Sequence, residues 1–137
     1  MLFRSRYDAL NGLYLSGDGK GGFTPRSILQ SGLYIPGNGK ALVRLRAAGG
    51  GSLLAAGQNR GPLKLFAQRH PLATLALQPS DVSVLIHYRN GQTRKEEVYY
   101  GASFLSQSGR FIDWNDHIVD VEITDNKGGK RGLKHPF

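Results

Sequence analysis

The chain has 137 residues with 19 glycines, six prolines and no cysteine, and its formal net charge is +8. This length accommodates one domain, or one domain with part of a second, and the lack of cysteine excludes disulfides and thiolate metal ligands. No apolar run approaches the roughly 20 residues of a membrane-spanning helix, and residues 1–10 (MLFRSRYDAL) lack the apolar core of a signal peptide.

Short apolar segments separated by glycine-rich turns fill the first half of the chain, and no segment has a convincing helical periodicity. Strands are predicted over residues 12–15, 23–24, 31–35, 40–47, 52–58 and 63–66. The last three are joined by short glycine turns and indicate an antiparallel meander, which is the pattern of one blade of a β-propeller.

Residues 67–72 (AQRHPL) interrupt this pattern with a proline and polar side chains, so we predict a boundary there. The expected domains are residues 1–68, with propeller-type strands, and residues 69–137, a small antiparallel β-sandwich or sheet. Further strands are predicted over residues 73–77, 82–89, 117–124 and 130–133. The fold class expected for the whole chain is therefore all-β.

Alternation with a period of two predicts which side chains face the core of the second domain. Those expected to point inward are Val82, Val84, Ile86, Tyr88, Val119, Val121 and Ile123. Ile118 is expected to point outward, because it alternates with the inward positions of its strand.

Asn90-Gly91 is the strongest hairpin signal in the sequence. A two-residue turn would place Val84 opposite Glu97, whereas a three-residue loop over residues 90–92 would place it opposite Val98. Because the second register keeps apolar residues together, we predict this register, with a glycine bulge in the loop.

The sequence contains no catalytic constellation, so we predict that the protein is not an enzyme. Residues 17–22 (GDGKGG) match the pattern G-x-G-x-x-G, but a strand start follows them instead of the helix that a dinucleotide site requires. The serines of residues 103–108 lack the second glycine of a nucleophile elbow. Glu96 and Glu97 point to opposite faces of one strand and cannot act as an acid–base pair.

Two polar segments are candidate binding sites, and their residues are Gln58, Asn59, Arg60, Ser106, Gln107 and Arg110. The first three form a turn whose two amides and guanidinium suit sugar hydroxyls or carboxylates. The last three belong to a loop that follows a strand end. In both segments the alternative is a structural role, in which the polar groups bond to nearby backbone and Arg110 anchors the loop.

Asp113, Asn115 and Asp116 are weak candidates for a calcium site, because hard cations prefer such oxygen ligands. An EF-hand loop that starts at Asp113 would need glycine and glutamate where Ile118 and Thr124 stand. An Asx-turn is therefore the expected role of the cluster. The four histidines show no metal-ligand spacing, and no cofactor is predicted.

The positive charge is concentrated in the first part of the chain. Residues 1–80 contain ten Lys and Arg against two acidic residues, whereas residues 81–137 contain eight of each kind. One interpretation is a basic nucleic-acid-binding β domain that would use Arg44, Arg46, Arg60 and Lys64. The other is a solvated face, which we favour because the basic residues are spaced singly and have few aromatic neighbours.

Three segments of the second half carry a family resemblance: residues 97–101 (EVYYG), residues 103–108 (SFLSQS) with Arg110, and residues 121–125 (VEITD). Together they resemble the ASPIC/UnbV-type C-terminal module that follows FG-GAP/VCBS-repeat β-propellers in bacterial surface proteins. The first half is similar to the last propeller repeats of the same proteins, through residues 6–9 (RYDA), 17–21 (GDGKG), 36–37 (PG), 40–42 (KAL) and 58–59 (QN).

The resemblance implies a non-catalytic, exported binding module, located outside the cell or on the outer-membrane surface of a bacterium, with a protein or glycan as its ligand. The propeller repeats of this family often hold calcium in D-x-D-x-D-G loops, which this sequence lacks. Its strands are too few to close a propeller ring. We therefore expect a C-terminal fragment with open strand edges that favour self-association. A role as an accessory domain of a hydrolase is a further hypothesis.

Overall fold

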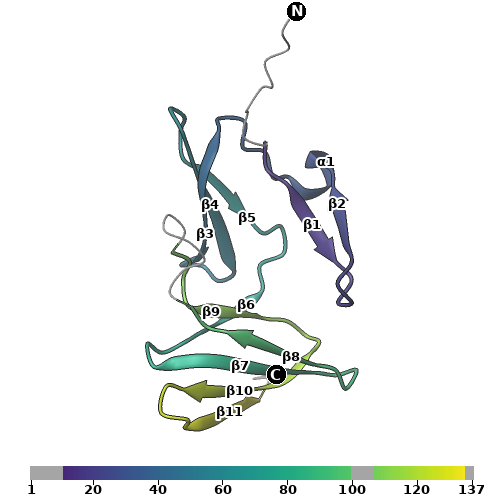
Figure 1. The fold of residues 1–137 in the computed structure, drawn as a ribbon, viewed down its shortest axis with the longest axis vertical. Helices are drawn as coiled ribbons and strands as arrows, with labels where there is room; N and C mark the ends of the chain where they lie inside the picture. Colours follow the sequence, from purple (N-terminus) through teal and green to yellow (C-terminus); the bar gives the residue numbers. More distant parts are fainter. Residues whose placement is uncertain (1–10, 100–106, 135–137) are drawn as a thin grey trace, which may run out of the picture. The chain divides into compact units, whose positions relative to one another are not determined.

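The computed structural model describes residues 11–99 and 107–134, and in this part of the chain the protein is all-β (Figure 1). The elements are β1 (Tyr14–Gly17), β2 (Phe23–Arg26), α1 (Ile28–Ser31), β3 (Gly39–Arg46), β4 (Ser52–Gln58), β5 (Lys64–Ala67), β6 (Ala73–Ala76), β7 (Asp81–Tyr88), β8 (Thr93–Glu97), β9 (Phe111–Trp114), β10 (Ile118–Asp125) and β11 (Lys130–Lys134). The expected fold class is confirmed.

The chain divides into two compact units. The first consists of the described residues up to Val43 together with Leu54–Phe66, and the second of Arg44–Leu53 together with the described residues from Ala67 onward. The division into a module of residues 1–68 and a module of residues 69–137 stays a prediction. The second compact unit takes in ten residues from the β3–β4 hairpin as well.

The first unit begins with the antiparallel hairpin β1–β2, in which Tyr14 lies opposite Arg26 and Gly17 opposite Phe23. Its turn is closed by Asp18, whose Oδ1 accepts hydrogen bonds from the backbone N–H groups of Lys20 (2.7 Å) and Gly22 (2.9 Å). Such a carboxylate-to-backbone turn fixes the hairpin locally, as the glycine-rich sequence predicts.

The strand expected over residues 31–35 does not form, and this prediction is wrong: helix α1 ends at Ser31, and residues 32–35 have no regular secondary structure. Helix α1 is closed at its start by a capping box, because Ser27 Oγ accepts from the N–H of Gln30 and Gln30 Oε1 accepts from the N–H of Ser27. Gly32 ends it with a left-handed φ of 70°. The pattern Ser-x-x-Gln followed by glycine is the signal that predicts such a helical turn.

Strands β3, β4 and β5 form a three-stranded sheet in chain order, which confirms the expected meander. Within the first unit, the buried residues Leu33, Ile35 and Ala56 form a small core, and Phe66 packs against it. Among the described residues the sheets do not form a closed propeller.

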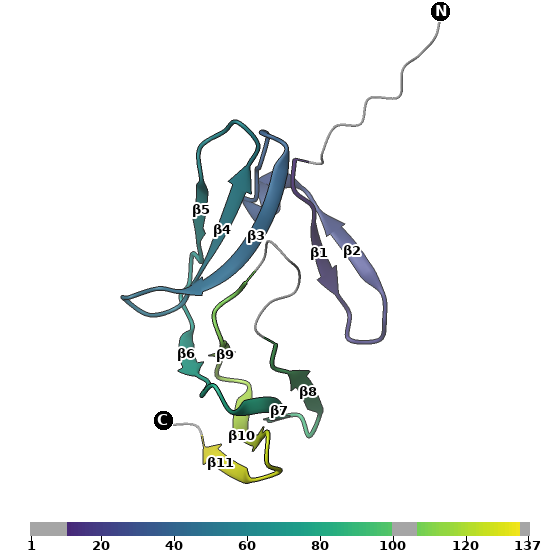
Figure 2. The same ribbon diagram turned by 60° about the vertical axis from the view of Figure 1, so that its left-hand side comes forward.

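The second unit contains a four-stranded sheet, in the order β11-β10-β7-β8, and a two-stranded sheet of β6 and β9 (Figure 2). Both sheets contribute to one core of Val84, Ile86, Ile112, Trp114, Ile118, Val121 and Ile123. Of the residues predicted to face inward, Val84, Ile86, Val121 and Ile123 are buried, Tyr88 packs against the core, and Val82 is exposed. The unit is thus a small two-layer β structure.

The predicted register of the β7–β8 hairpin is wrong, because Val84 lies opposite Glu96 and not opposite a valine. The loop has three residues, as predicted, but it covers residues 89–91 and so begins one residue earlier. Gly91 has a left-handed φ of 79° and donates its N–H to the Tyr88 carbonyl (2.9 Å). The last position of this loop type requires that backbone conformation, and glycine adopts it without a steric cost.

The alternation predicted for β10 fails at its first two residues. Ile118 is buried and Val119 is 44% exposed, the reverse of the expectation. The cause is a register shift against β7 between Ile118 and Asp120, which inserts one residue and changes the face that follows. Beyond this bulge the expected pattern holds, with Val121 and Ile123 in the core.

Candidate functional site

The predicted site at Gln58 lies in the first unit, where β4 ends. Gln58 Oε1 accepts a hydrogen bond from the N–H of Gly37 (2.6 Å), and Gln58 Nε2 donates to the Pro62 carbonyl (2.7 Å). A Cβ atom at Gly37 would lie 2.5 Å from Gln58 Oε1, so a larger residue at position 37 would displace the Gln58 amide from this position. Gln58 therefore joins two turns, and both ends of its amide are engaged.

The two residues that follow Gln58 are exposed. Asn59 donates its backbone N–H to the Asn38 carbonyl (3.0 Å), which leaves its side chain at the tip of the turn. Arg60 has a left-handed φ of 58°, an uncommon conformation for a residue with a side chain. This tip is the part of the predicted site that can reach a ligand.

The second predicted site is described only in part, since Ser106 lies outside the described residues. Gln107 is exposed. Arg110 donates from Nη2 to the carbonyls of Gln78 (3.2 Å) and Asp81, and its own carbonyl accepts from the N–H of Leu77 (3.0 Å). Arg110 thus holds β9 beside the segment that joins β6 to β7.

A buried ion pair lies next to Arg110, and the sequence did not predict it. The Asp81 side chain is fully buried, and Arg131 binds it with two parallel contacts, Nη1 to Oδ1 (2.6 Å) and Nη2 to Oδ2 (2.5 Å). The N–H of Gln78 donates to Oδ2 as well (2.7 Å). The hydrogen bonds from Arg131 lower the pKa of Asp81 against the effect of burial, and they raise the pKa of Arg131.

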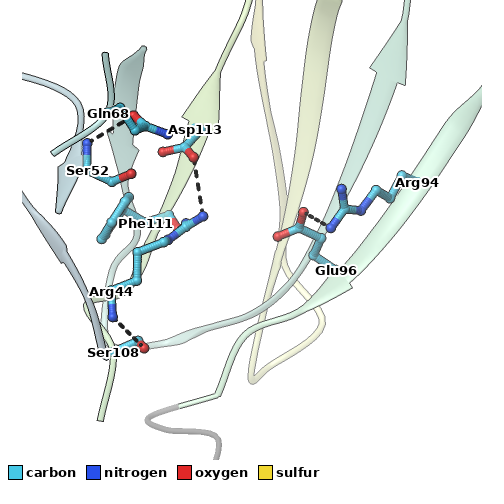
Figure 3. A network of polar contacts seen from close by, with 8 residues as sticks. All are labelled: Arg44, Ser52, Gln68, Arg94, Glu96, Ser108, Phe111 and Asp113. Atoms are coloured by element: carbon cyan, nitrogen blue, oxygen red, sulfur yellow. Dashed lines mark hydrogen bonds and ion pairs between the residues drawn. The ribbon is translucent and has the colours of Figure 1, made fainter. Parts of the chain in front are cut away.

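Arg44 makes a second network in the same unit (Figure 3). Its guanidinium lies 4.4 Å from the centroid of the Phe111 ring, donates to the Phe111 carbonyl (2.8 Å) and pairs with Asp113 Oδ2 (3.3 Å). Its backbone N–H donates to Ser108 Oγ (3.0 Å), and its carbonyl accepts from the N–H of Gly109 (2.6 Å). Arg44 and Ser108 therefore hold the end of the predicted loop in place. Bonding of Ser108 to backbone is the structural role expected from the sequence as the alternative to ligand binding.

Two of the three weak calcium candidates already have partners within the protein. Asp113 Oδ2 is paired with Arg44, whose positive charge opposes a bound cation. Asn115 Oδ1 accepts from the N–H of His117 (3.0 Å), which is an Asx-turn, and Asp116 is exposed. In the part of the chain that the structure describes, no group of three or more His, Asp or Glu side chains could hold a metal ion.

Some of these polar side chains are bonded within their own unit, and others are exposed at turns. Gln58, Arg110 and Arg44 bind backbone groups of their own unit, whereas Asn59, Arg60 and Gln107 remain exposed at turns. Sequence reasoning missed Asp81 because an acid before an apolar strand is usually a turn residue. The sequence signal for this ion pair is indirect, because Asp81 at the start of β7 and Arg131 in β11 are far apart in the chain. The folded sheet brings them together.

The described residues thus form an all-β protein with two compact units. Some of its strands have open edges, and exposed polar side chains lie at its turns. No family model, no curated protein and no solved structure matches this chain. Within the described ranges, no helix has the length and apolar character that crossing a membrane requires.

Proposed function

We propose that the protein is a non-catalytic binding module, the C-terminal part of an exported surface protein with FG-GAP/VCBS-type propeller repeats and an ASPIC/UnbV-like end. Its ligand is a protein or a glycan, and its place is outside the cell or on the outer-membrane surface. The sequence motifs support the family assignment, and the surface of the first unit supports the binding role.

The observation that carries the binding role is a group of exposed apolar side chains in β1, β2 and α1, which we call the hairpin surface. Its members are Leu13, Tyr14, Leu15, Phe23, Ile28 and Leu29. Leu29 is 96% exposed and Phe23 is 68% exposed. Large apolar side chains gathered in this way are typical of surfaces that bind another protein.

The pairing of β1 with β2 places part of this surface on one face of the hairpin. Leu15 lies opposite Pro25 and Gly17 opposite Phe23, so Leu15 and Phe23 point to the same side, two positions apart. The Phe23 ring leans over Gly17, where an added Cβ would touch it at 3.5 Å. Leu15, Pro25 and Phe23 thus share one apolar face of the hairpin, which favours a protein over a glycan as the ligand.

Each unit also exposes polar side chains at turns. Asn59 and Arg60 in the first unit and Gln107 in the second are the predicted site residues whose side chains are exposed. Exposed amide and guanidinium groups add hydrogen-bond donors and acceptors for a ligand that contacts their own unit. Self-association through the hairpin surface would use its apolar side chains, whereas self-association through open strand edges would use backbone N–H and C=O groups.

Nucleic-acid binding is the alternative function, and one of its four basic residues argues against it. Arg44 binds Asp113, the Phe111 carbonyl and the Phe111 ring, so its charge is already paired within the second unit. Binding to DNA or RNA that weakens steeply with salt would favour this alternative.

The proposal is tested with the whole chain on protein and glycan arrays, together with size-exclusion chromatography and light scattering. A partner selected on the array should bind Phe23→Ser and Leu29→Ser at least about tenfold more weakly, because both substitutions remove apolar contact area. Leu63→Ser is the control, since Leu63 is 63% exposed, close to the 68% of Phe23, but lies outside the hairpin surface.

Equal binding by all three variants would show that the hairpin surface is not the site. A monomer that binds nothing on either array would contradict the proposed function itself.

A further inference from the structure

Strand β6 has one open side. It pairs with β9 alone among the described strands, with Ala73 opposite Trp114 and Leu75 opposite Ile112, and the N–H of Leu77 donates to the Arg110 carbonyl (3.0 Å). Backbone hydrogen bonds alternate along an antiparallel pair. The backbone groups of residues 73, 75 and 77 therefore face β9, and those of Thr74 and Ala76 face the open side.

A groove of about 250 Å³ lies beside this open side. It is lined by Ala73, Thr74, Leu75, Trp114, Leu133 and Lys134, all from the second unit. Most of these side chains are apolar, and the polar ones are a single hydroxyl and a single ammonium group. In Figure 2, β6 lies at the outer side of β9. The groove thus combines an apolar floor with a strand edge whose N–H and C=O groups are turned outward.

The two edge strands of the four-stranded sheet, β8 and β11, carry charges that discourage strand pairing. In β8, Arg94 pairs with Glu96 (2.9 Å) and Lys95 with Glu97 (2.7 Å), so the strand carries two ion pairs along its edge. Strand β11 (KRGLK) has three basic residues among its five. By contrast, β6 (ATLA) has neither a charge nor a proline. Proteins often protect open edges with charges, and an edge without them presents its backbone groups to another strand.

We propose that β6 binds an extended peptide segment of a partner protein as an added strand. The peptide backbone pairs with Thr74 and Ala76, one of its apolar side chains enters the groove against Trp114 and Leu133, and an acidic residue pairs with Lys134. Strand addition is a recurring mode of peptide recognition, in which main-chain hydrogen bonds give affinity and a pocket gives selectivity. The inference rests on the proposed binding function and names its ligand class.

A glycan fits this groove less well than a peptide. Recognition of a sugar needs several side-chain donors and acceptors that converge on its hydroxyls. Here Thr74 and Lys134 are the polar side chains of the lining, and the remaining polar groups belong to the backbone edge.

Tryptophan fluorescence can report binding in the groove, because Trp114 lines it and is the single tryptophan of the chain. The probes are seven-residue peptides that alternate valine with threonine and carry one glutamate at varied positions. We expect a saturable change in tryptophan emission. Copies of the same peptides with alternate backbone amides N-methylated keep their side chains but cannot pair as strands, and they should bind at least about tenfold more weakly, which is about 1.4 kcal/mol.

Two variants test the site itself. Thr74→Pro removes the outward N–H and leaves the bonds to β9, and proline is tolerated on the open side of an edge strand. Leu133→Lys places a charge in the groove at a residue that is already 37% exposed. Each should weaken peptide binding at least about tenfold. Val119→Lys is the control, since it adds the same charge to an exposed residue of β10 outside the groove lining.

Three results would overturn the inference. The first is equal binding by Thr74→Pro and the unchanged chain, or no response to any peptide at about 1 mM. The second is a dimer that Thr74→Pro converts to a monomer, which would make a second copy the occupant. The third is equal binding of N-methylated and unmodified peptides. If the array partner still depends on Phe23 and Leu29, the proposed function survives any of these results.

Discussion

The two compact units use the same turn and reach different degrees of burial. Residues 18–22 (DGKGG) close β1–β2, and residues 125–129 (DNKGG) close β10–β11. In both turns the aspartate Oδ1 accepts from the second and fourth following N–H groups, at 2.7 and 2.9 Å in one and 2.8 and 2.8 Å in the other. The aspartate hydrogen bonds are therefore shared, although Gly19 has a left-handed φ of 73° and the equivalent Asn126 does not.

The strands around the two turns differ. Val121 and Ile123 of β10 are fully buried in a core of seven residues, whereas β1 and β2 expose their apolar side chains and the first unit buries only a small cluster. The comparison shows that this turn motif closes a hairpin in both units. Burial of the apolar side chains of the hairpin requires a second apolar layer that packs against it. In the first unit that layer is absent from the described residues, which is why we interpret the hairpin surface as a binding surface.

The largest expected effect comes from the second core. Ile123→Ala should lower the free energy of unfolding by about 4 kcal/mol, because it opens a cavity in a well-packed interior. Ile35→Ala, in the small core of the first unit, should cost about 2 kcal/mol. Urea unfolding followed by tryptophan emission measures the first, and amide hydrogen exchange measures the second. Equal costs would contradict the difference in packing.

The next effect concerns the buried ion pair. Arg131→Ala leaves the buried Asp81 carboxylate without its main partner, and we expect a loss of about 3 kcal/mol in the free energy of unfolding. Lys130→Ala is the matched control, since its exposed pair with Glu122 (2.9 Å) should contribute less than about 1 kcal/mol. A loss for Arg131→Ala no larger than that of the control would show that the pair is not structural.

The same pair makes stability depend on pH. The pKa of Asp81 is lowered chiefly by the hydrogen bonds from Arg131, so the folded carboxyl is more acidic than the unfolded one. Its contribution is fully present above the unfolded pKa of about 4 and is lost as the pH falls through the lower folded pKa. Acid titration of urea unfolding should therefore show a steeper loss for the unchanged chain than for Asp81→Asn. Parallel curves would refute this account.

The smallest effect tests the shared turn directly. Asp18→Ala and Asp125→Ala should each lower local stability by about 1 kcal/mol, the value of a comparable side-chain cap. Amide exchange at Gly22 and Gly129, the fourth residue of each turn, measures it. Similar acceleration at both glycines would sharpen the comparison. A large effect at one glycine alone would show that the turns differ in kind.

Sequence reasoning located the elements that depend on local chemistry. The turns at Asp18, Asn38, Arg60 and Asp125 and most strand positions follow from glycine, asparagine and aspartate at the required places. It failed where a contact between distant segments decides the outcome, as in the pairing of β6 with β9 and the burial of Asp81 by Arg131. It failed as well at the bulge beside Val119, because one inserted residue reverses a period-two pattern.

The candidate sites show the same limit. The polarity of Gln58 and Arg110 was evident, but polarity alone cannot distinguish a ligand-binding group from one that bonds to its own backbone. In the structure, the Gln58 side chain forms hydrogen bonds with Gly37 and Pro62, and the Arg110 side chain forms hydrogen bonds with Gln78 and Asp81. Asn59, Arg60 and Gln107 stay predicted contacts.

The most direct test of the binding role is amide hydrogen exchange of the whole chain with and without its array-selected partner. We predict slower exchange in β1, β2 and α1 when the partner is bound, and unchanged exchange in β10 with its buried Val121 and Ile123. Unchanged exchange throughout residues 13–29 in the presence of a saturating partner would contradict the central claim.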